Sequence, residues 1–119
     1  MKKKVSTKPT NVSFTSEEIL NFCEHACSSK KALGIKIIDV RKKTDIADYF
    51  LICSGTSDVH VQSIADGVLE VLKKHKLSVV GVEGYKSAQW ILVDTGNVVL
   101  HIFHEYIRDV YDLESLWSS

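Results

Sequence analysis

The first regular pattern in the chain is an amphipathic helix that follows a polar N-terminal stretch over residues 1–13. We expect the helix to begin at Thr15, because Thr15 and Glu18 have the spacing of a capping box. The predicted helix ends near Ser28 or Lys30. Its apolar stripe has the helical spacing expected for a face that packs on a core: Ile19, Phe22, Cys23, Ala26 and Cys27.

Short apolar runs with turn residues between them predict strands in the rest of the chain. The run over residues 49–54 is almost wholly apolar, which is typical of a central strand covered on both faces. A second helix is predicted from the turn at residues 55–58 to about His75, with Ile64, Ala65, Val68, Val71 and Leu72 on its buried face. Further strands are predicted over residues 35–40, 77–82, 89–93 and 98–103, and residues 94–97 carry a strong hairpin signal between the last two. Two short helices, over 105–110 and 113–117, close the chain, and Asp112 is placed to cap the last one.

This order of elements predicts an α/β (α+β) fold with a single domain and a mixed five-stranded sheet flanked by helices. The strand–helix–strand unit through the second helix is expected to form a right-handed parallel crossover, and the final hairpin makes the sheet mixed. A chain of 119 residues, 45% of them hydrophobic, suffices for one compact domain with a real core. We expect residues 1–13 to form a disordered basic tail and residues 14–119 to form the folded domain.

The charges cancel over the whole chain but are unevenly distributed. Residues 1–34 carry six Lys and three Glu, a net charge of +3, whereas residues 35–119 carry nine Lys or Arg and twelve Asp or Glu, a net charge of −3. Nucleic-acid-binding domains usually have a basic body, because phosphate contacts supply much of their affinity. The acidic body therefore favours a basic protein partner over sequence-specific binding to nucleic acid, although an unremarkable surface would also account for it.

The cysteines and the N-terminal residues bear on the compartment. Three cysteines, an odd number, argue against a disulfide framework and for a reducing environment. The three lysines after Met1 have no apolar stretch behind them, and no run is long enough to span a bilayer. We therefore expect a cytoplasmic protein that does not bind membranes.

Several residues are candidates for catalytic or metal-binding groups. Cys23 and Cys27 are four residues apart, but they lie on the apolar stripe and no second His or Cys pair follows at zinc-like spacing. His101 and His104 lack the spacing of a zincin helix. The turn at residues 54–57 resembles a phosphate-binding turn, but Asp58 is the only acid near it, so a metal-binding carboxylate pair is missing. The sequence thus predicts no catalytic residues, no metal and no cofactor.

Aromatic and polar residues gather instead around the final hairpin and the C-terminus. Trp and Tyr are enriched at protein interfaces, where they bury large areas. The candidates are Tyr85, Trp90, Asp94, Thr95, Tyr111 and Trp117. For Trp117 we favour a place in the core, and for Trp90 the sequence leaves core and interface equally open.

Seven stretches, in the same order, resemble the Iojap/RsfS family of ribosomal silencing factors, and the resemblance covers the chain from about Ile35 to Trp117. They are DIADYF (45–50), SGTS (54–57), IAD (64–66), VEG (82–84), WILVD (90–94), VLHIF (99–103) and RDVYDLESLW (108–117). The resemblance implies a fold related to nucleotidyltransferases but without their catalytic carboxylates. It also implies that the protein binds ribosomal protein fourteen of the large subunit, blocks joining of the small subunit and so lowers translation when nutrients are scarce. Members of the family also tend to form homodimers.

The resemblance also implies roles for particular residues. Trp90 would be the apolar anchor on the ribosomal protein, and Asp94 would offer a carboxylate to its basic side chains. Tyr111 and Thr95 would border the same patch, and His101 would support it. Thr95 departs from the larger apolar or aromatic residue of many relatives, and Ala88-Gln89 also differ from common forms.

Two other functions remain open on the sequence. A nucleotidyltransferase-like enzyme would need two carboxylates near the Ser54-Gly55 turn, and Asp39, Asp48 and Asp94 are the plausible donors. A ribosome assembly or dimerisation module would use the same apolar patch.

Overall fold

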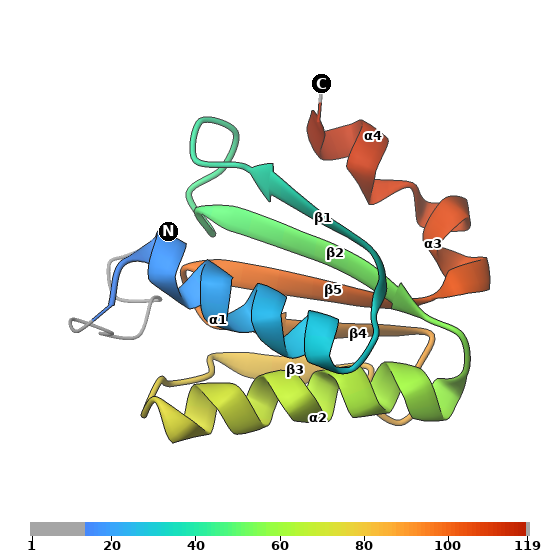
Figure 1. Cartoon of the computed structure of the whole chain (residues 1–119). Helices are drawn as coiled ribbons and strands as arrows, with labels where there is room; N and C mark the ends of the chain where they lie inside the picture. Colours follow the sequence, from blue (N-terminus) through green and yellow to red (C-terminus); the bar gives the residue numbers. More distant parts are fainter. Residues whose placement is uncertain (1–13, 119) are drawn as a thin grey trace.

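The computed structural model describes residues 14–118, so the predicted N-terminal tail lies outside the described residues. Figure 1 shows one sheet with helices on both sides. The elements, in chain order, are α1 (Ser16–Ser29), β1 (Leu33–Asp39), β2 (Tyr49–Gly55), α2 (Asp58–Lys74), β3 (Gly81–Glu83), β4 (Trp90–Asp94), β5 (Val98–His104), α3 (Glu105–Tyr111) and α4 (Leu113–Ser118). Within this part of the chain, no helix has the length and apolar character needed to cross a membrane.

The five strands form one mixed sheet in the order β1-β2-β5-β4-β3. β2 and β5 are parallel at the centre, and the other three neighbouring pairs are antiparallel. Every residue of β2 is buried, as the continuous apolar run predicts. The pairings give β3 the same direction as β2, so the predicted parallel connection through α2 is confirmed in direction, although β5 and β4 lie between the two strands.

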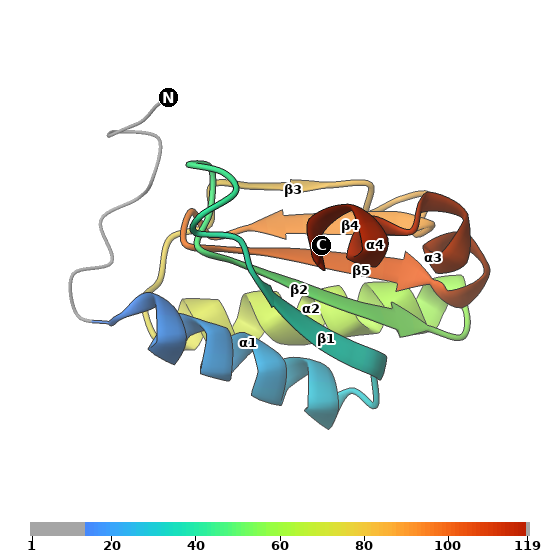
Figure 2. The ribbon, with the colours of Figure 1, turned by 90° about the horizontal axis from the view of Figure 1, so that it is seen from above.

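The two faces of the sheet belong to two separate apolar clusters. The inward residues of α1 and α2 pack on one face, against alternate residues such as Leu51, Leu100 and Ile91. The other residues of the same strands, including Phe50 and Phe103, face Ile107, Leu113 and Trp117 of the C-terminal region. Figure 2 shows α1 and α2 running side by side along the sheet. The period-two alternation of the strands thus produces one core on each side.

Most boundaries agree with the predictions because the local signals are strong. Thr15 caps α1 with the predicted reciprocal hydrogen bonds to Glu18, and Ser57 caps α2 by accepting from the N–H of His60. The third strand was predicted over 77–82 but comprises only Gly81–Glu83. Leu77 is buried, yet its N–H donates to the carbonyl of Leu72 in the last turn of α2, so Leu77 fills the core without joining the sheet.

The connection between the last two helices also differs from expectation. Asp112 was predicted to cap α4, but it ends α3 instead, in the left-handed conformation with φ 46°, and its N–H donates to the carbonyl of Arg108. Asp tolerates this conformation better than most residues. The turn allows α4 to fold back over β1, which it contacts.

Candidate protein-binding site

Strand β4 presents three side chains on the sheet face opposite α1 and α2. Ile91 and Val93 point into the helix-covered core, whereas Trp90, Leu92 and Asp94 alternate with them and are half-buried. On the neighbouring strand β3, the register places the exposed Glu83 beside Leu92. We call Trp90, Leu92, Asp94 and Glu83 the β4 face. The terminal helices pack on β1, β2 and β5, so this half of the sheet keeps an exposed surface.

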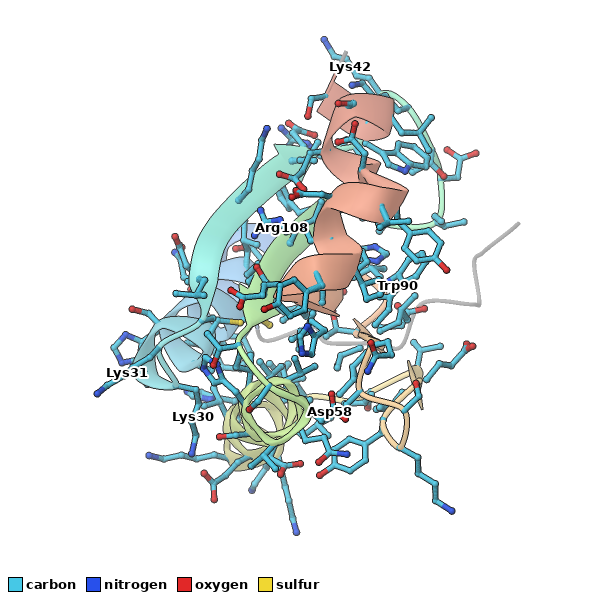
Figure 3. The ribbon with its side chains drawn as sticks, turned by 90° about the vertical axis from the view of Figure 1, so that its right-hand side faces the viewer. Lys30, Lys31, Lys42, Asp58, Trp90 and Arg108 are labelled. Carbon is cyan, nitrogen blue, oxygen red and sulfur yellow. The ribbon has the colours of Figure 1, made fainter. Side chains whose placement is uncertain are left out.

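Trp90 is held by aromatic neighbours on two other elements. Its ring stacks on Phe103 of β5, with centroids 5.0 Å apart, and lies 4.8 Å from the ring of Tyr111 at the end of α3. Its indole N–H donates to Nδ1 of His101 at 3.1 Å. Figure 3 shows Trp90 beside the terminal helices. The indole is therefore fixed in orientation while part of it stays accessible.

His101 supports the indole from within the sheet. It is only 6% exposed and lies edge-to-face with Phe50, with centroids 4.9 Å apart. Because Nδ1 accepts from the indole, the ring proton resides on Nε2, which has no hydrogen-bond partner among the described residues. Burial lowers the pKa of His101 to about 4, so the ring is neutral near pH 7. His101 thus lies beneath the surface and holds the indole of Trp90 from below.

The structure places Asp94 and Tyr111 at the same surface as Trp90. One carboxylate oxygen of Asp94 accepts from the N–H of Gly96 at 2.8 Å, and its other oxygen forms no hydrogen bond or ion pair within residues 14–118. Tyr111 is 55% exposed. These two residues, with Trp90, can contact a partner without any rearrangement.

Two other predicted site residues lie elsewhere. Thr95 is fully buried, and its hydroxyl both donates to the carbonyl and accepts from the N–H of Val98, which closes the hairpin turn. Tyr85 donates its hydroxyl to the Asp66 carboxylate, and Gln62 donates to its carbonyl, so Tyr85 is fastened to α2. In this conformation Thr95 offers no side chain to a partner, and Tyr85 is turned toward the helices.

Two residues of the β4 face were missed from the sequence. Leu92 stands two positions after Trp90, so strand alternation already places both side chains on one face. Glu83 joins them only through the pairing of β3 with β4, which no local pattern reveals. Trp117, expected in the core, is half-buried with its ring 5.0 Å from that of Phe50.

The carboxylates required by the enzyme hypothesis lie at the wrong end of the sheet. Asp39 pairs with Tyr49 in register, and Asp94 pairs with Val99, whereas the turn with Gly55 is at the other end of β2. Six residues of extended strand separate the two ends by roughly 20 Å.

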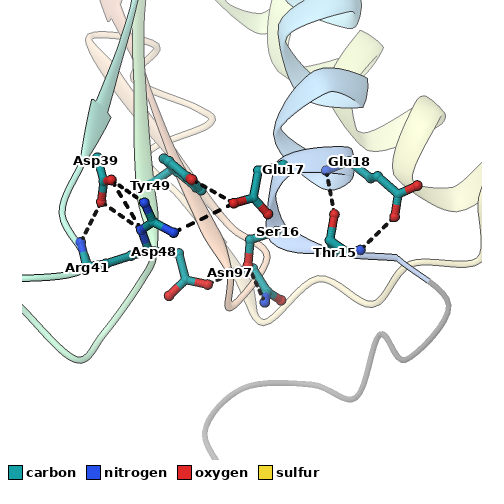
Figure 4. A network of polar contacts seen from close by, with 9 residues as sticks. All are labelled: Thr15, Ser16, Glu17, Glu18, Asp39, Arg41, Asp48, Tyr49 and Asn97. Atoms are coloured by element: carbon teal, nitrogen blue, oxygen red, sulfur yellow. Dashed lines mark hydrogen bonds and ion pairs between the residues drawn. The ribbon is translucent and has the colours of Figure 1, made fainter.

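Each of the two carboxylates near the β1–β2 connection also has a structural partner (Figure 4). Hydrogen bonds from Arg41 lower the pKa of Asp39 to about 2, and Asp48 accepts from the hydroxyl of Ser16 in α1. Among residues 14–118, no group of three His, Cys, Asp or Glu side chains is arranged to hold a metal ion. The carboxylate pair of a metal-dependent transferase is therefore not assembled at the Ser54-Gly55 turn.

The three cysteines pack in the core, as the apolar stripe of α1 predicts for Cys23 and Cys27. Cys23, Cys27 and Cys53 are buried and free, with the sulfur atoms of Cys27 and Cys53 4.0 Å apart. Burial raises the pKa of the Cys23 thiol to about 12, and its contact with Cys53 together with burial raises that of Cys27. Both thiols therefore stay protonated and unreactive at neutral pH.

Comparison with known proteins points to one family. Residues 13–119 match the family model described as "Ribosomal silencing factor during starvation". The Bacillus subtilis protein named "Ribosomal silencing factor RsfS" is 42% identical over 102 residues, which cover 86% of each chain. A mouse protein named "Mitochondrial assembly of ribosomal large subunit protein 1" is 33% identical over 92 residues, 75% of this chain and 40% of that protein. A crystal structure of a Chromobacterium violaceum protein superimposes with a TM-score of 0.87 at 33% identity, and the match covers 89% of this chain and 88% of that one.

Proposed function

Because this chain belongs to the RsfS family of ribosomal silencing factors, we propose that it docks on the large ribosomal subunit through the β4 face and keeps the small subunit from joining. Its direct contact is ribosomal protein fourteen of the large subunit. Translation is thereby lowered when nutrients are scarce. The protein acts in the cytoplasm by binding, without catalytic residues or a cofactor, and forms a homodimer when free.

The observation that carries this proposal is an oriented, partly accessible indole on an otherwise uncovered half-sheet. Interfaces derive much of their affinity from a few central Trp, Tyr or Arg side chains that are well packed when bound. Phe103, Tyr111 and His101 already restrict the Trp90 ring. Docking therefore loses little side-chain entropy at this position.

Charge and size favour the same mode of action. Residues 35–119 have a net charge of −3, and Asp94 adds an accepting carboxylate oxygen beside the indole. Ribosomal proteins are basic, so such a surface favours encounter with one of them. The described domain measures 35 × 34 × 22 Å, which is large enough to obstruct a second subunit by bulk.

A binding measurement with purified large subunits tests the anchor. Trp90→Ala is expected to remain folded and to lose about 2 kcal/mol or more of binding free energy, roughly a 30-fold rise in Kd. Trp117→Ala is the matched control, because it also removes an indole, but one that belongs to α4 and packs on Phe50 rather than on the β4 face. Equal affinity of Trp90→Ala and the wild-type protein would show that the anchor lies elsewhere, and unfolding of Trp90→Ala would show that Trp90 is a core residue.

A second candidate function is assembly of the large subunit, favoured by the name of the mouse relative. An assembly factor would use the same β4 face on an immature particle. Depletion of the protein in its host separates the two functions. Loss of an assembly factor causes precursor particles to accumulate, whereas loss of a silencing factor leaves mature subunits that keep translating during starvation.

A further inference from the structure

A shallow pocket of about 270 Å³ lies between β3 and β4 on the β4 face. It is lined by Glu83, Gly84, Trp90 and Leu92. Pockets for drug-sized ligands generally exceed this volume, so the pocket has the size for one protruding side chain. Its walls are the apolar surfaces of Trp90 and Leu92, and Glu83 adds a carboxylate.

The backbone at Gly84 keeps the two strands close at this pocket. Gly84 has φ +80°, and a Cβ atom there would lie 2.2 Å from the carbonyl oxygen of Trp90. A residue with a side chain would force the two segments apart. The shape of the pocket thus depends on a glycine at this position.

The charge of the pocket is uncompensated within the described chain. The carboxylate of Glu83 is exposed and forms no hydrogen bond or ion pair with another residue of 14–118, whereas Glu114 pairs with Arg108 and Asp39 pairs with Arg41. Asp94 lies two positions along β4 from Leu92 and also keeps one oxygen unbonded in the same region. Two carboxylates therefore flank Leu92 on this face.

We propose that this pocket receives an arginine side chain of the protein partner, with its methylene stem against Leu92 and Trp90 and its guanidinium on the Glu83 carboxylate. The inference rests on the proposed function and adds to it the type of partner side chain that enters this pocket. The planar guanidinium donates two parallel hydrogen bonds to a carboxylate and packs on aromatic rings, which a lysine ammonium does less well. Arginine is also enriched at interfaces.

Another pocket, at the C-terminal end of α2, shows what distinguishes this site. It is lined by Glu70, Val71, Lys73 and Lys74 and so carries both signs of charge. Such a lining gives no preference for a cation. Glu70, which is exposed on α2, therefore supplies a matched control for Glu83.

The first test compares Glu83→Gln with Glu70→Gln in binding to purified large subunits at several salt concentrations. Glu83→Gln removes the charge and keeps the shape. We expect its Kd to rise about fivefold or more and to depend less steeply on salt, because a charge-assisted contact is lost. Glu70→Gln should bind within about twofold of the wild-type protein. Equal affinities for both variants would overturn the assignment of Glu83.

The second test needs no ribosome. The wild-type protein is titrated with N-acetyl-arginine methylamide, its citrulline analogue and its lysine analogue, and the Trp90 indole N–H is followed by NMR. The arginine compound should shift this signal at millimolar concentration, the uncharged citrulline compound should shift it much less, and Glu83→Gln should remove the difference. Equal shifts with citrulline or lysine, or no shift with arginine, would overturn the proposal.

The two tests separate this inference from the proposed function. If the wild-type protein does not bind large subunits at all, the proposed function fails. If it binds and the Glu83→Gln and Glu70→Gln variants bind equally well, only the arginine pocket fails.

Discussion

At the scale of single residues, the site depends on a hydrogen bond between an indole and a buried imidazole. Trp90 supplies the accessible surface, and His101 accepts its N–H from beneath. The second ring nitrogen of His101 is buried without a partner in the described chain, so the ring is held at an energetic cost. Such a cost is consistent with a role of His101 in positioning the indole.

This arrangement predicts that stability falls in mild acid. The folded-state pKa of His101 is lowered to about 4 from an ordinary value of 6.5, so between these values the unfolded chain binds a proton that the folded protein excludes. The contribution of His101 is therefore fully present above about pH 6.5 and declines as the pH falls toward 4. The total loss is on the order of 3 kcal/mol.

Urea unfolding of the wild-type protein and His101→Gln at pH 7.5 and pH 5 checks this expectation. The variant has an amide that cannot titrate in this range, so its free energy of unfolding should fall less between the two pH values. The same pH dependence in both proteins would contradict the pKa of His101.

At this scale the sequence named some of the residues that lie together at the candidate site and missed others. Trp90 was a candidate because Trp is enriched at protein interfaces, although its position alone left core and interface equally open, and Asp94 received its role from the family resemblance. Burial of Thr95 was not foreseeable, because it depends on whether the hydroxyl closes the turn or faces solvent. Glu83 was missed because its neighbours come from strand pairing.

At the scale of elements, Arg108 fastens the terminal helices to the edge of the sheet. From α3 it donates to the carbonyls of Leu33 and Gly34 and the hydroxyl of Ser54, and it pairs with Glu114 in α4. Figure 3 shows it between β1 and the terminal helices. Its side chain is only 13% exposed. Because Tyr111 follows on the same helix, Arg108 also determines where that ring meets Trp90.

Arg108→Met should therefore destabilise the protein by about 2–4 kcal/mol, because it leaves the buried hydroxyl of Ser54, the carbonyls of Leu33 and Gly34 and the half-buried carboxylate of Glu114 without their donor. Hydrogen exchange in α3 and α4 should rise more than in α1. Arg41→Met is the control: Arg41 also pairs with a carboxylate, but its side chain is 51% exposed, so the loss should stay below about 1 kcal/mol. Similar losses in the two variants would show that Arg108 does not hold the helices.

A pair of glycines tests the geometry of the β3–β4 edge. Gly84→Ala should lower the free energy of unfolding by more than about 2 kcal/mol and change the fluorescence of Trp90, because φ is +80° and the new Cβ meets the Trp90 carbonyl. At Gly81, which begins β3, an added Cβ meets no atom within 4 Å. The free energy of unfolding of Gly81→Ala should therefore be within about 0.5 kcal/mol of that of the wild-type protein. Thermal unfolding of the two variants provides the comparison, and equal melting temperatures would contradict the close approach at Gly84.

Helices and central strands were predictable from the sequence because their signals are local. The capping box at Thr15 and the apolar run of β2 each fix an element without reference to the rest of the chain. The third strand was overestimated because Leu77 has the apolar pattern of a strand but packs below α2. The order of the strands and the uncovered half of one sheet face could not be predicted from the sequence, because strand pairing joins residues that are far apart along the chain.

At the scale of the whole molecule, the unequal covering of the two sheet faces leaves open the surface that we propose for binding. Helices α1 and α2 close one face, while α3 and α4 pack over β1, β2 and β5 on the other and leave the β4 face accessible. One side thus supplies stability and the other supplies an acidic surface with an apolar anchor. On this account the molecule represses translation by occupying space on the large subunit.

The most direct test follows the joining of purified small and large ribosomal subunits by light scattering, with the protein in excess over the large subunit. The account predicts that the wild-type protein lowers the joined fraction in proportion to its occupancy of the large subunit. Trp90→Ala, at the same concentration, should leave joining nearly intact. Undiminished joining with saturating wild-type protein, or equal inhibition by Trp90→Ala, would contradict it.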